Sequence, residues 1–367
     1  MKKVTLILWV FCAVFFSCSD DDNQTVNPKP DKPKPDDDGN PKRELTITKL
    51  ATSIEQQVRA VQFIDEQTGF MAGGEAYPEE KAFLLKTTDG GNSWEKVFAE
   101  DGFYITGVAL IDKNIIMAST NKGYLLRSEN GGSTWNKLDA FENDFYMADI
   151  RFQDENTGYV VGSVNSVGII IRSTDGGLNW APVEVDPITL LQDNPLNTIT
   201  FAENNTVLLS GGTYDNGQIL KSTDGGENWT GLSLSSKVMI TDLVIKGNEG
   251  FAIGNNGQTN ASTEKGELFK TLDKGVSWSK VTTEFDNKLI SIDWLGNTLC
   301  IVGANKSNNL SDPEFALLSF DGGSTWEKLA HEEVIGGWKD VCFISENKVI
   351  LVGYKGLALM VTIATNE

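Results

Sequence analysis

The feature that most constrains this chain is a short turn motif that recurs six times. Each copy is a glycine-rich turn that begins with Ser or Thr and ends with Trp, as in residues 173–180, Ser-Thr-Asp-Gly-Gly-Leu-Asn-Trp. Successive copies lie 41, 45, 49, 49 and 48 residues apart, and they close at Trp94, Trp135, Trp180, Trp229, Trp278 and Trp326. A fixed period in this range predicts a protein built from repeats of one supersecondary unit.

Each turn is expected to join two strands of a β-hairpin. An aliphatic run precedes it, as in residues 83–87, and a Trp-led run follows, as in residues 94–97. The turn carboxylate can accept bonds from backbone N–H groups of its own turn, and glycines supply the positive φ angles. One such residue per repeat indicates a structural role rather than metal or acid chemistry. The position is held by Asp89, Asn130, Asp175, Asp224, Asp273 and Asp321.

At these residues the chain resembles the Asp-box (BNR) repeat, Ser-x-Asp-x-Gly-x-x-Trp. Four copies carry the full pattern, among them residues 222–229 and 319–326. Asn130 replaces Asp in the second copy, and Lys274 replaces the first Gly in the fifth. The resemblance covers roughly residues 44–363. It is specific for a fold and does not specify an activity.

Every repeat shows the same order of four strands, which defines a propeller blade. In the third unit the strands are expected at residues 147–152, 159–162, 168–173 and 180–183. The seventh unit ends without a Trp-led strand, and residues 44–50 can supply its outer strand and close the ring. The sequence therefore predicts an all-β, seven-bladed β-propeller of four-stranded antiparallel blades. Its first strands are Val58–Phe63, Ile105–Leu110, Met147–Phe152, Leu196–Phe201, Ile240–Ile245, Leu289–Trp294 and Trp338–Phe343.

The N-terminal segment carries the marks of export. Two lysines precede an apolar run at residues 4–16, which is too short to span a bilayer, so residues 1–17 are expected to be a signal peptide. Phe15-Phe16-Ser17-Cys18 resembles a bacterial lipobox, which makes Cys18 the expected lipidation site. The acidic run that follows resembles an outer-membrane surface-export tag. Residues 18–43 are acidic and Pro-rich and predict an extended tether, with the propeller at residues 44–367.

Charge and composition exclude several kinds of partner and cofactor. The net charge of −20 argues against nucleic acid and anionic membrane surfaces as partners of the domain. A single histidine, His331, leaves no basis for a His dyad or a multi-His metal site. We expect no cofactor, no metal site and a monomer. Cys300 and Cys342 each lie in an apolar strand, as buried free thiols or, alternatively, as a disulfide between adjacent repeats.

The candidate site lies around the propeller axis. The third residues of the first strands are all small or acidic, and Asp149, Asp242 and Asp340 there can hold water or bind a cation or polar ligand. The loops before these strands carry Phe103, Tyr104, Phe141, Phe145, Tyr146 and Trp338. These rings form a rim for protein or sugar recognition, or several pack beneath the loops as core. The candidate ligand or partner residues are Arg59, Tyr104, Tyr146, Asp149, Asp242, Trp338, Lys339 and Asp340.

Two classes of function remain, a binding scaffold and a glycan-directed protein. A sialidase needs an arginine cluster, whereas only Arg43, Arg59 and Arg151 lie outside the turn motifs. Gly158-Tyr-Val-Val-Gly162, followed by residues 170–175, resembles the photosystem II stability/assembly factor family. This resemblance implies a non-catalytic scaffold that binds other proteins, but it does not imply a photosynthetic setting. The export signals place the expected scaffold in the cell envelope. The alternative is a carbohydrate binder or a glycoside hydrolase with a carboxylate pair; no catalytic residue is assigned.

Overall fold

The computed structural model describes residues 43–76, 78–139, 141, 145–203, 205–234, 237–257, 265–281, 285–304, 315–331 and 337–365. Residues 44–364 form one compact unit. The predicted signal peptide, Cys18 and all of the tether except Arg43 lie outside the described residues. In the part that is described, no helix is long and apolar enough to cross a membrane.

The described chain forms seven four-stranded sheets, which we number as blades in chain order. Blade 1 contains β2 (Val58–Phe63), β3 (Gly69–Glu75), β4 (Lys81–Thr87) and β5 (Glu95–Asp101). Blade 2 contains β6 (Ile105–Leu110), β7 (Ile116–Thr120), β8 (Tyr124–Ser128) and β9 (Asn136–Asp139). Blade 3 contains β10 (Tyr146–Phe152), β11 (Gly158–Val164), β12 (Val167–Ser173) and β13 (Ala181–Pro182). Blade 4 contains β14 (Leu196–Ala202), β15 (Thr206–Thr213), β16 (Asn216–Ser222) and β17 (Thr230–Ser233). Blade 5 contains β18 (Met239–Lys246), β19 (Glu249–Asn256), β20 (Lys265–Thr271) and β21 (Ser279–Lys280). Blade 6 contains β22 (Lys288–Leu295), β23 (Thr298–Ala304), β24 (Ala316–Ser319) and β25 (Glu327–Lys328). Blade 7 contains β26 (Trp338–Ser345), β27 (Lys348–Gly353), β28 (Ala358–Thr365) and, as its outer strand, β1 (Arg43–Lys49). Two 3-10 helices, η1 (Ile188–Leu190) and η2 (Tyr354–Gly356), lie in loops.

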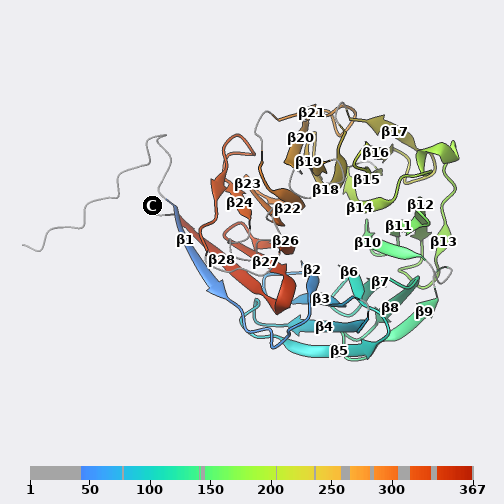
Figure 1. Cartoon of the computed structure of the whole chain (residues 1–367). Helices are drawn as coiled ribbons and strands as arrows, with labels where there is room; N and C mark the ends of the chain where they lie inside the picture. The colour runs from blue at the N-terminus through green and yellow to red at the C-terminus, as the bar shows by residue number, and fades with distance from the viewer. Residues whose placement is uncertain are drawn as a thin grey trace, which may run out of the picture. The chain divides into compact units, whose positions relative to one another are not determined.

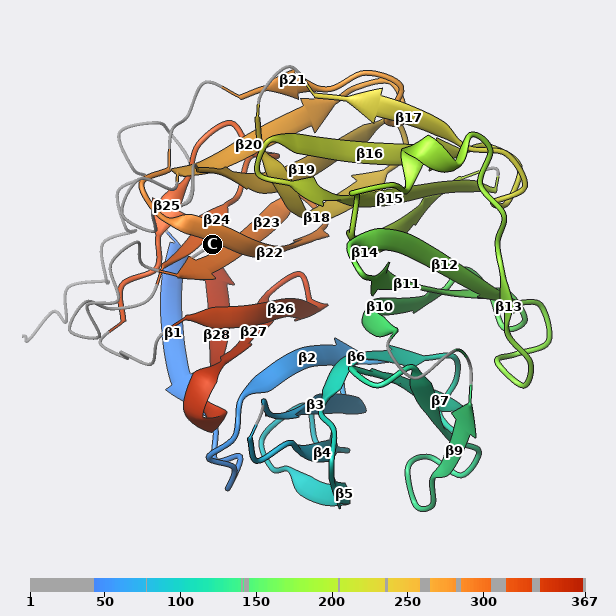
Figure 2. The same ribbon diagram turned by 45° about the vertical axis from the view of Figure 1, so that its right-hand side comes forward.

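The blades follow one another around a ring, with the first strand of each blade innermost (Figure 1). Consecutive innermost strands contact each other, and β26 of blade 7 contacts β2 of blade 1. The N-terminal strand β1 pairs with β28, beside which it lies in both views (Figure 2). The predicted seven-bladed fold and its closure by the N-terminal strand are therefore confirmed. Two of the seven predicted first strands match in full, and the others differ by one or two residues at an end.

The hydrogen bonds of the turn motif are those that the sequence predicts. In blade 4 the Asp224 Oδ1 accepts bonds from the Ser222 hydroxyl at 2.7 Å and the Asn228 N–H at 2.9 Å. The same hydroxyl accepts the Gly226 N–H at 2.8 Å, and the Trp229 indole donates to the Gly226 carbonyl. Gly226 has a φ of 84°, in the left-handed region. Each turn thus closes on its own side chains.

The turns also tie neighbouring blades together. A basic residue on the third strand of one blade donates to a carbonyl in the turn of the next blade, and we call this a cation–turn contact. Four are present among the described residues: Lys86 to Gly131, Arg127 to Gly176, Arg172 to Gly225 and Lys221 to Lys274. A turn tryptophan also contributes to the packing between blades, because Trp135 of blade 2 packs against a core cluster that contains Phe70 of blade 1.

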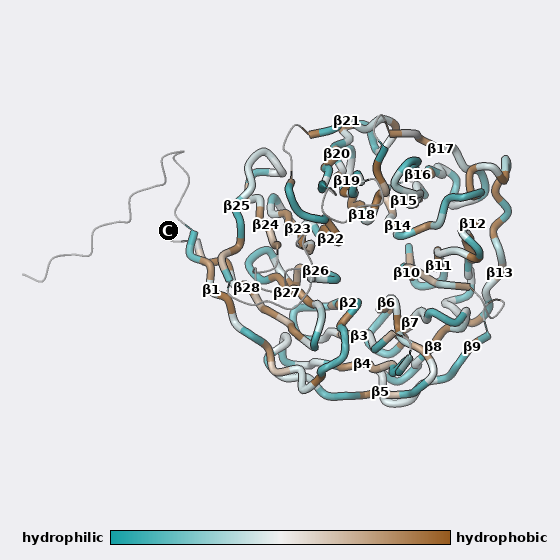
Figure 3. Tube along the Cα trace, in the orientation of Figure 1, coloured by the Kyte–Doolittle hydropathy of each residue, from teal (hydrophilic) through white to brown (hydrophobic). Residues whose placement is uncertain are grey.

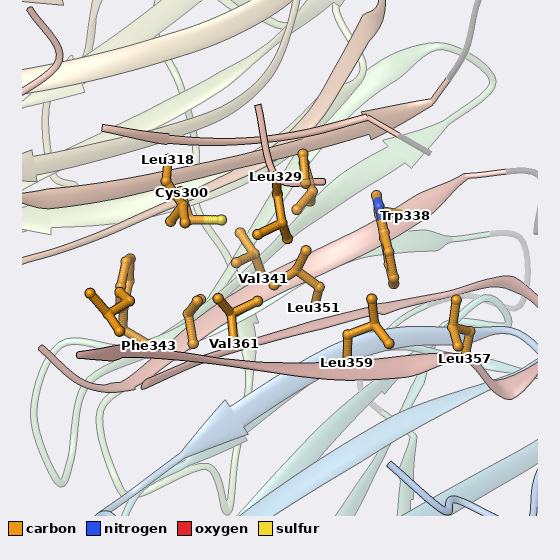
Figure 4. Packing of buried hydrophobic residues seen from close by; sticks show 14 residues of the cluster. Cys300, Leu318, Leu329, Trp338, Val341, Phe343, Leu351, Leu357, Leu359 and Val361 are labelled. Carbon is orange, nitrogen blue, oxygen red and sulfur yellow. The ribbon is translucent and has the colours of Figure 1, made fainter. Parts of the chain in front are cut away.

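The hydrophobic core consists of clusters that lie mostly between adjacent blades. In one of them the fully buried Trp338 of blade 7 packs with Leu329 of blade 6 and with Leu357 and Leu359 (Figure 4). Hydrophilic segments lie instead at the inner ends of β10, β14 and β26 (Figure 3). Cys300 is buried and Cys342 is half-buried; both are free thiols, and burial raises the pKa of each. The disulfide alternative is not formed.

The buried hydroxyl of the turn motif gives the first prediction. Ser222→Ala should lower the free energy of unfolding by about 1–3 kcal/mol, because it leaves the buried Gly226 N–H without its acceptor. Ser222→Thr should lose much less, since Thr87 and Thr271 make the same bond in blades 1 and 5. Urea denaturation of the three proteins measures the difference. Equal stability of the Ala and Thr variants would contradict this role.

Candidate functional site at the channel mouth

A β-bulge in every innermost strand shapes the centre of the propeller. Positions along these strands are numbered from the starts that the sequence predicts, which are Val58, Ile105, Met147, Leu196, Ile240, Leu289 and Trp338. In all seven strands the pairing register shifts between the first and third of these positions, as between Val58 and Ala60. The second residue is the extra one, and both it and the third residue line the central cavity. The sequence analysis expected only the third residues there. The second residues are Arg59, Thr106, Ala148, Asn197, Thr241, Ile290 and Lys339.

The central cavity is small and polar. Its volume is about 140 Å³, below the range of roughly 300–1,000 Å³ that is typical of small-molecule sites. Besides the second residues, it is lined by the third residues and by Val61, Gln62, Val108 and Arg151. Seven of the eight predicted site residues are accounted for here or at the mouth: Arg59, Asp149, Asp242, Lys339 and Asp340 line the cavity, and Tyr104 and Tyr146 adjoin it through Arg59.

The channel carboxylates have a structural task that follows from sheet geometry. An innermost strand is a sheet edge, so alternate N–H groups have no partner strand. Asp149 accepts one such N–H from its own blade, at Ile150 (2.8 Å), and one from the next blade, at Ile199 (3.2 Å). Thr198 of that next blade adds a hydroxyl bond at 3.0 Å. We call this arrangement a carboxylate bridge, because one side chain joins two blades.

The same bridge recurs on alternate blades. Asp242 of blade 5 accepts the N–H groups of Leu243 and Ile292, at 2.8 and 2.9 Å. Asp340 of blade 7 accepts those of Val341 and Val61, both at 2.9 Å, and so bridges the point where the ring closes. Three carboxylates therefore satisfy the fourth-residue N–H groups of six blades.

A second layer of bridges lies one step deeper along the strands. Asp293 of blade 6 accepts the N–H groups of Trp294 and Phe343, at 2.8 and 2.6 Å. Gln62 of blade 1 accepts the N–H of Leu110 in blade 2 at 3.1 Å. Burial raises the pKa of Asp293. Polar side chains at the fifth position thus repeat the role of those at the third.

Arg151 supplies positive charge beside these acids. Its Nε lies 3.2 Å from Asp149 Oδ2, and its side chain is 46% exposed, so solvent weakens this ion pair. Burial raises the pKa of Asp242 to about 6 and of Asp340 to about 7, whereas the charge of Arg151 lowers both. The negative charges around Arg151 in turn raise its own pKa. The sequence analysis did not assign Arg151 to the site, because its position on the channel depends on register.

The two acids on blades 5 and 7 approach each other closely. Ser291 Oγ lies 3.0 Å from Asp242 Oδ2 and 2.9 Å from Asp340 Oδ1, so these oxygens are within about 6 Å, close to the spacing in retaining glycosidases. However, both oxygens of each carboxyl group already accept a backbone N–H. The pair is therefore bound into the scaffold. Among the described residues, no group of three His, Cys, Asp or Glu side chains could hold a metal ion.

Tyrosines and cations cluster at the mouth of the channel. The Arg59 guanidinium lies 4.1 Å from the centroid of the Tyr104 ring, and the Lys339 Nζ lies 4.8 Å from that of Tyr354. Tyr146 is 42% exposed, yet burial of its hydroxyl end and the neighbouring Tyr104 raise its pKa to about 12. Tyr354, which the sequence analysis missed, comes from η2 and is 37% exposed.

The aromatic residues of the predicted rim divide into two groups. Phe103, Phe145 and Trp338 are at most 1% exposed and belong to the core. Phe141 is half-buried and packs against the ring of Phe145. The prediction that Trp338 contacts a ligand or partner is wrong, because its ring packs inside the cluster of Figure 4 and against His331. Tyr104 and Tyr146 follow directly after two of these phenylalanines; Tyr104 is half-buried and Tyr146 is exposed. Each loop thus anchors a Phe and presents a Tyr.

A second hollow, of about 810 Å³, lies between blades 5 and 6. Its aromatic lining residue, Trp294, packs against Phe251, lies near Lys246 and donates its indole N–H to the Gly296 carbonyl. Asp321 of a turn motif lines this hollow, but none of the eight candidate ligand or partner residues does.

Comparisons with known proteins agree with this architecture. The profile of the family described as Photosynthesis system II assembly factor YCF48 matches residues 140–293, less than half of the chain. The structure titled "YCF48 bound to D1 peptide" has a TM-score of 0.63 and 17% identity, covering 86% of this chain and 96% of that one. YCF48 from Cyanidioschyzon merolae has a TM-score of 0.62 and 14% identity, covering 86% and 98%. An ancestral GH74 enzyme has a TM-score of 0.62 and 18% identity, covering 84% and 45%. No curated protein matches.

These similarities define a class of protein. The chain is a seven-bladed β-propeller, and its resemblance to the photosystem II assembly factor family, expected from the repeats, is confirmed by the family profile. The structural similarities, all below 25% identity, establish the fold alone.

The position of Arg151 gives a prediction about charge. Arg151→Gln should raise the pKa values of Asp242 and Asp340, because it removes a positive charge that favours their ionised forms. Carboxyl-carbon NMR titration measures these values. Lys339→Gln is the control and should move them less, since its ammonium group lies over Tyr354. Unchanged pKa values in Arg151→Gln would show that Arg151 is not the counter-charge.

Proposed function

We propose that this protein is a non-catalytic scaffold of the cell envelope that binds another protein at its channel mouth. The observation that carries the proposal is that the residues inside the channel and the residues at its mouth have different roles. The carboxylates inside the channel are engaged by main-chain N–H groups, whereas Arg59, Tyr104, Tyr146 and Lys339 gather at the mouth. The family profile and the solved complex of YCF48 with a D1 peptide support a protein partner.

The chemistry of the mouth favours an anionic segment of the partner. Tyr and Arg are the residues that most often carry binding energy at protein interfaces. Arg59 and Lys339 occupy adjacent blades, 1 and 7, at the second strand positions. They form a local positive patch on a chain of net charge −20, and opposite charge steers encounter with a partner.

A glycan-directed activity is the second candidate. The spacing of Asp242 and Asp340 favours it, because two carboxyls within about 6 Å can serve a retaining hydrolase. Their main-chain bonds and the small cavity favour the scaffold instead. Sugar release from a polysaccharide panel that disappears in Asp242→Asn would support the hydrolase.

The mouth can be tested with a photo-cross-linking amino acid in the full-length protein in cells. At Tyr146, the cross-linker should capture one discrete protein; at Leu178, which is 54% exposed in a turn motif, it should not. Arg59→Glu or Lys339→Glu should weaken this binding at least about tenfold, or about 1.4 kcal/mol. The matched reversal Lys328→Glu, on the outer strand β25, should not. Equal effects of all three charge reversals would exclude the mouth as the binding site of the partner.

We also propose that Cys18 anchors the protein to the bacterial outer membrane. The lipobox-like segment and the acidic residues after it support this proposal. Cys18→Ala should abolish incorporation of a labelled fatty acid and release the protein from the membrane fraction, whereas Cys12→Ala should leave both unchanged. Retention of the label in Cys18→Ala would contradict lipidation at this residue. Protease treatment of intact cells then distinguishes surface from periplasmic display.

A further inference from the structure

The Ser291 hydroxyl lies between two carboxyl groups but has only one hydrogen to donate. It lies within hydrogen-bond distance of two carboxyl oxygens, Asp242 Oδ2 and Asp340 Oδ1. If both carboxyl groups were ionised, one oxygen would face a lone pair of the hydroxyl instead of a hydrogen. The arrangement is satisfied when one carboxyl group carries a proton and donates it to Ser291, while Ser291 donates to the other.

Blade 4 provides an internal comparison. Thr198 holds the same strand position as Ser291, and its hydroxyl donates to Asp149 of the preceding blade at 3.0 Å. The N–H of the following residue, Ile199, bonds to that same carboxylate oxygen, as Ile292 does to Asp242. Only at Ser291 does a second carboxyl group, from blade 7, also meet the hydroxyl. The extra acid, rather than the hydroxyl, is what creates the need for a proton.

We propose that the propeller stores one proton in the chain Asp242–Ser291–Asp340, and that this proton is part of the link between blades 5, 6 and 7. In the stored state a carboxyl O–H of Asp340 donates to Ser291 Oγ, and Ser291 donates to Asp242 Oδ2. The oxygen that carries the proton still accepts the Val341 N–H through its remaining lone pair. No bond of the carboxylate bridges is given up.

The surroundings of the pair are consistent with a retained proton. Burial raises the pKa of Asp242 and Asp340, to about 6 and about 7. The charged and titratable groups that face them are Asp149 and Arg151 of β10, Asp293 of β22 and Cys342 of β26, and Arg59 and Lys339 line the same cavity.

The contribution of Asp340 to folding stability decreases as pH rises. An acid whose pKa is higher in the folded than in the unfolded state stabilises the fold most at low pH. Asp340 therefore contributes fully below its unfolded value of 3.8, and the contribution is lost as pH rises through about 7. Above that range two carboxylates compete for one hydroxyl hydrogen, and one of the interblade contacts of Ser291 is lost.

Infrared spectroscopy of the intact protein tests the proposal through the carbonyl stretch of a protonated carboxylic acid. The band should be present at about pH 6, where ordinary Asp and Glu side chains are ionised, and lost by about pH 9. At about pH 7 it should be nearly lost in Asp340→Asn, whose amide can donate to Ser291 without holding a titratable proton, because the remaining acid, Asp242, has a pKa of about 6. Asp149→Asn, which removes a neighbouring carboxylate outside the pair, should keep it. Absence of the band in the wild-type protein, or its undiminished strength at about pH 7 in Asp340→Asn, would overturn the proposal.

A second pair of variants keeps the test informative if Asp340→Asn does not fold. Ser291→Ala removes two hydrogen bonds from the singly protonated pair but only one from the doubly ionised pair, so the pH midpoint of the band should move downward by about one unit. Thr198→Ala removes the equivalent hydroxyl of blade 4, which meets one carboxylate, and should leave the midpoint unchanged. Equal midpoints in the wild-type protein and both variants would show that Ser291 does not couple the two acids.

Discussion

The unpaired edge of the innermost strand is the constraint on which the rest of this propeller depends. Each blade turns a row of backbone N–H groups toward the axis, where no further strand exists to accept them. Asp149, Asp242 and Asp340 resolve the problem two blades at a time, which explains why the acids fall on blades 3, 5 and 7. Three carboxylates serve six blades, so one of the seven blades has no such partner for its fourth-position N–H group. That residue is Val108 of blade 2, where the third positions of blades 1 and 2 are Ala60 and Gly107 instead of Asp.

This distribution of acids also shapes the electrostatics of the channel. Blades 1 and 2 carry no acid at the third position, and on this side the mouth presents Arg59 stacked on Tyr104. Lys339 lies on blade 7, next to blade 1 in the closed ring. Arg59 and Lys339 thus lie at the second positions of neighbouring blades, on or beside the pair of consecutive blades, 1 and 2, that have no acid at the third position. At the outer edge the chemistry is reversed, since basic side chains donate to the carbonyls of neighbouring turns.

Much of the fold was predictable because the repeat fixes it locally. The turn motif carries its own hydrogen bonds, so Asp224 and Trp229 could be assigned a role from spacing alone. The mouth was harder to predict, because burial of a ring depends on loop geometry: Phe103 and Tyr104 are neighbours in sequence, yet Phe103 is buried and Tyr104 is only half-buried. The bulge was invisible as well, although it brings Lys339 and Asp340 to the same cavity. The dual contact of Ser291 depends on three blades and has no signature in sequence.

Amide hydrogen exchange at single-residue resolution tests most directly whether side-chain bridges hold the blades together. The N–H groups of Val61, Ile199 and Ile292 each bond to a carboxylate of the preceding blade, whereas that of Val108 has no such carboxylate beside it. The three bridged amides should exchange only when the whole propeller unfolds, and Val108 should exchange faster through local opening. If the three bridged amides exchange as fast as Val108 does, the carboxylates do not bridge the blades, and the central claim is contradicted.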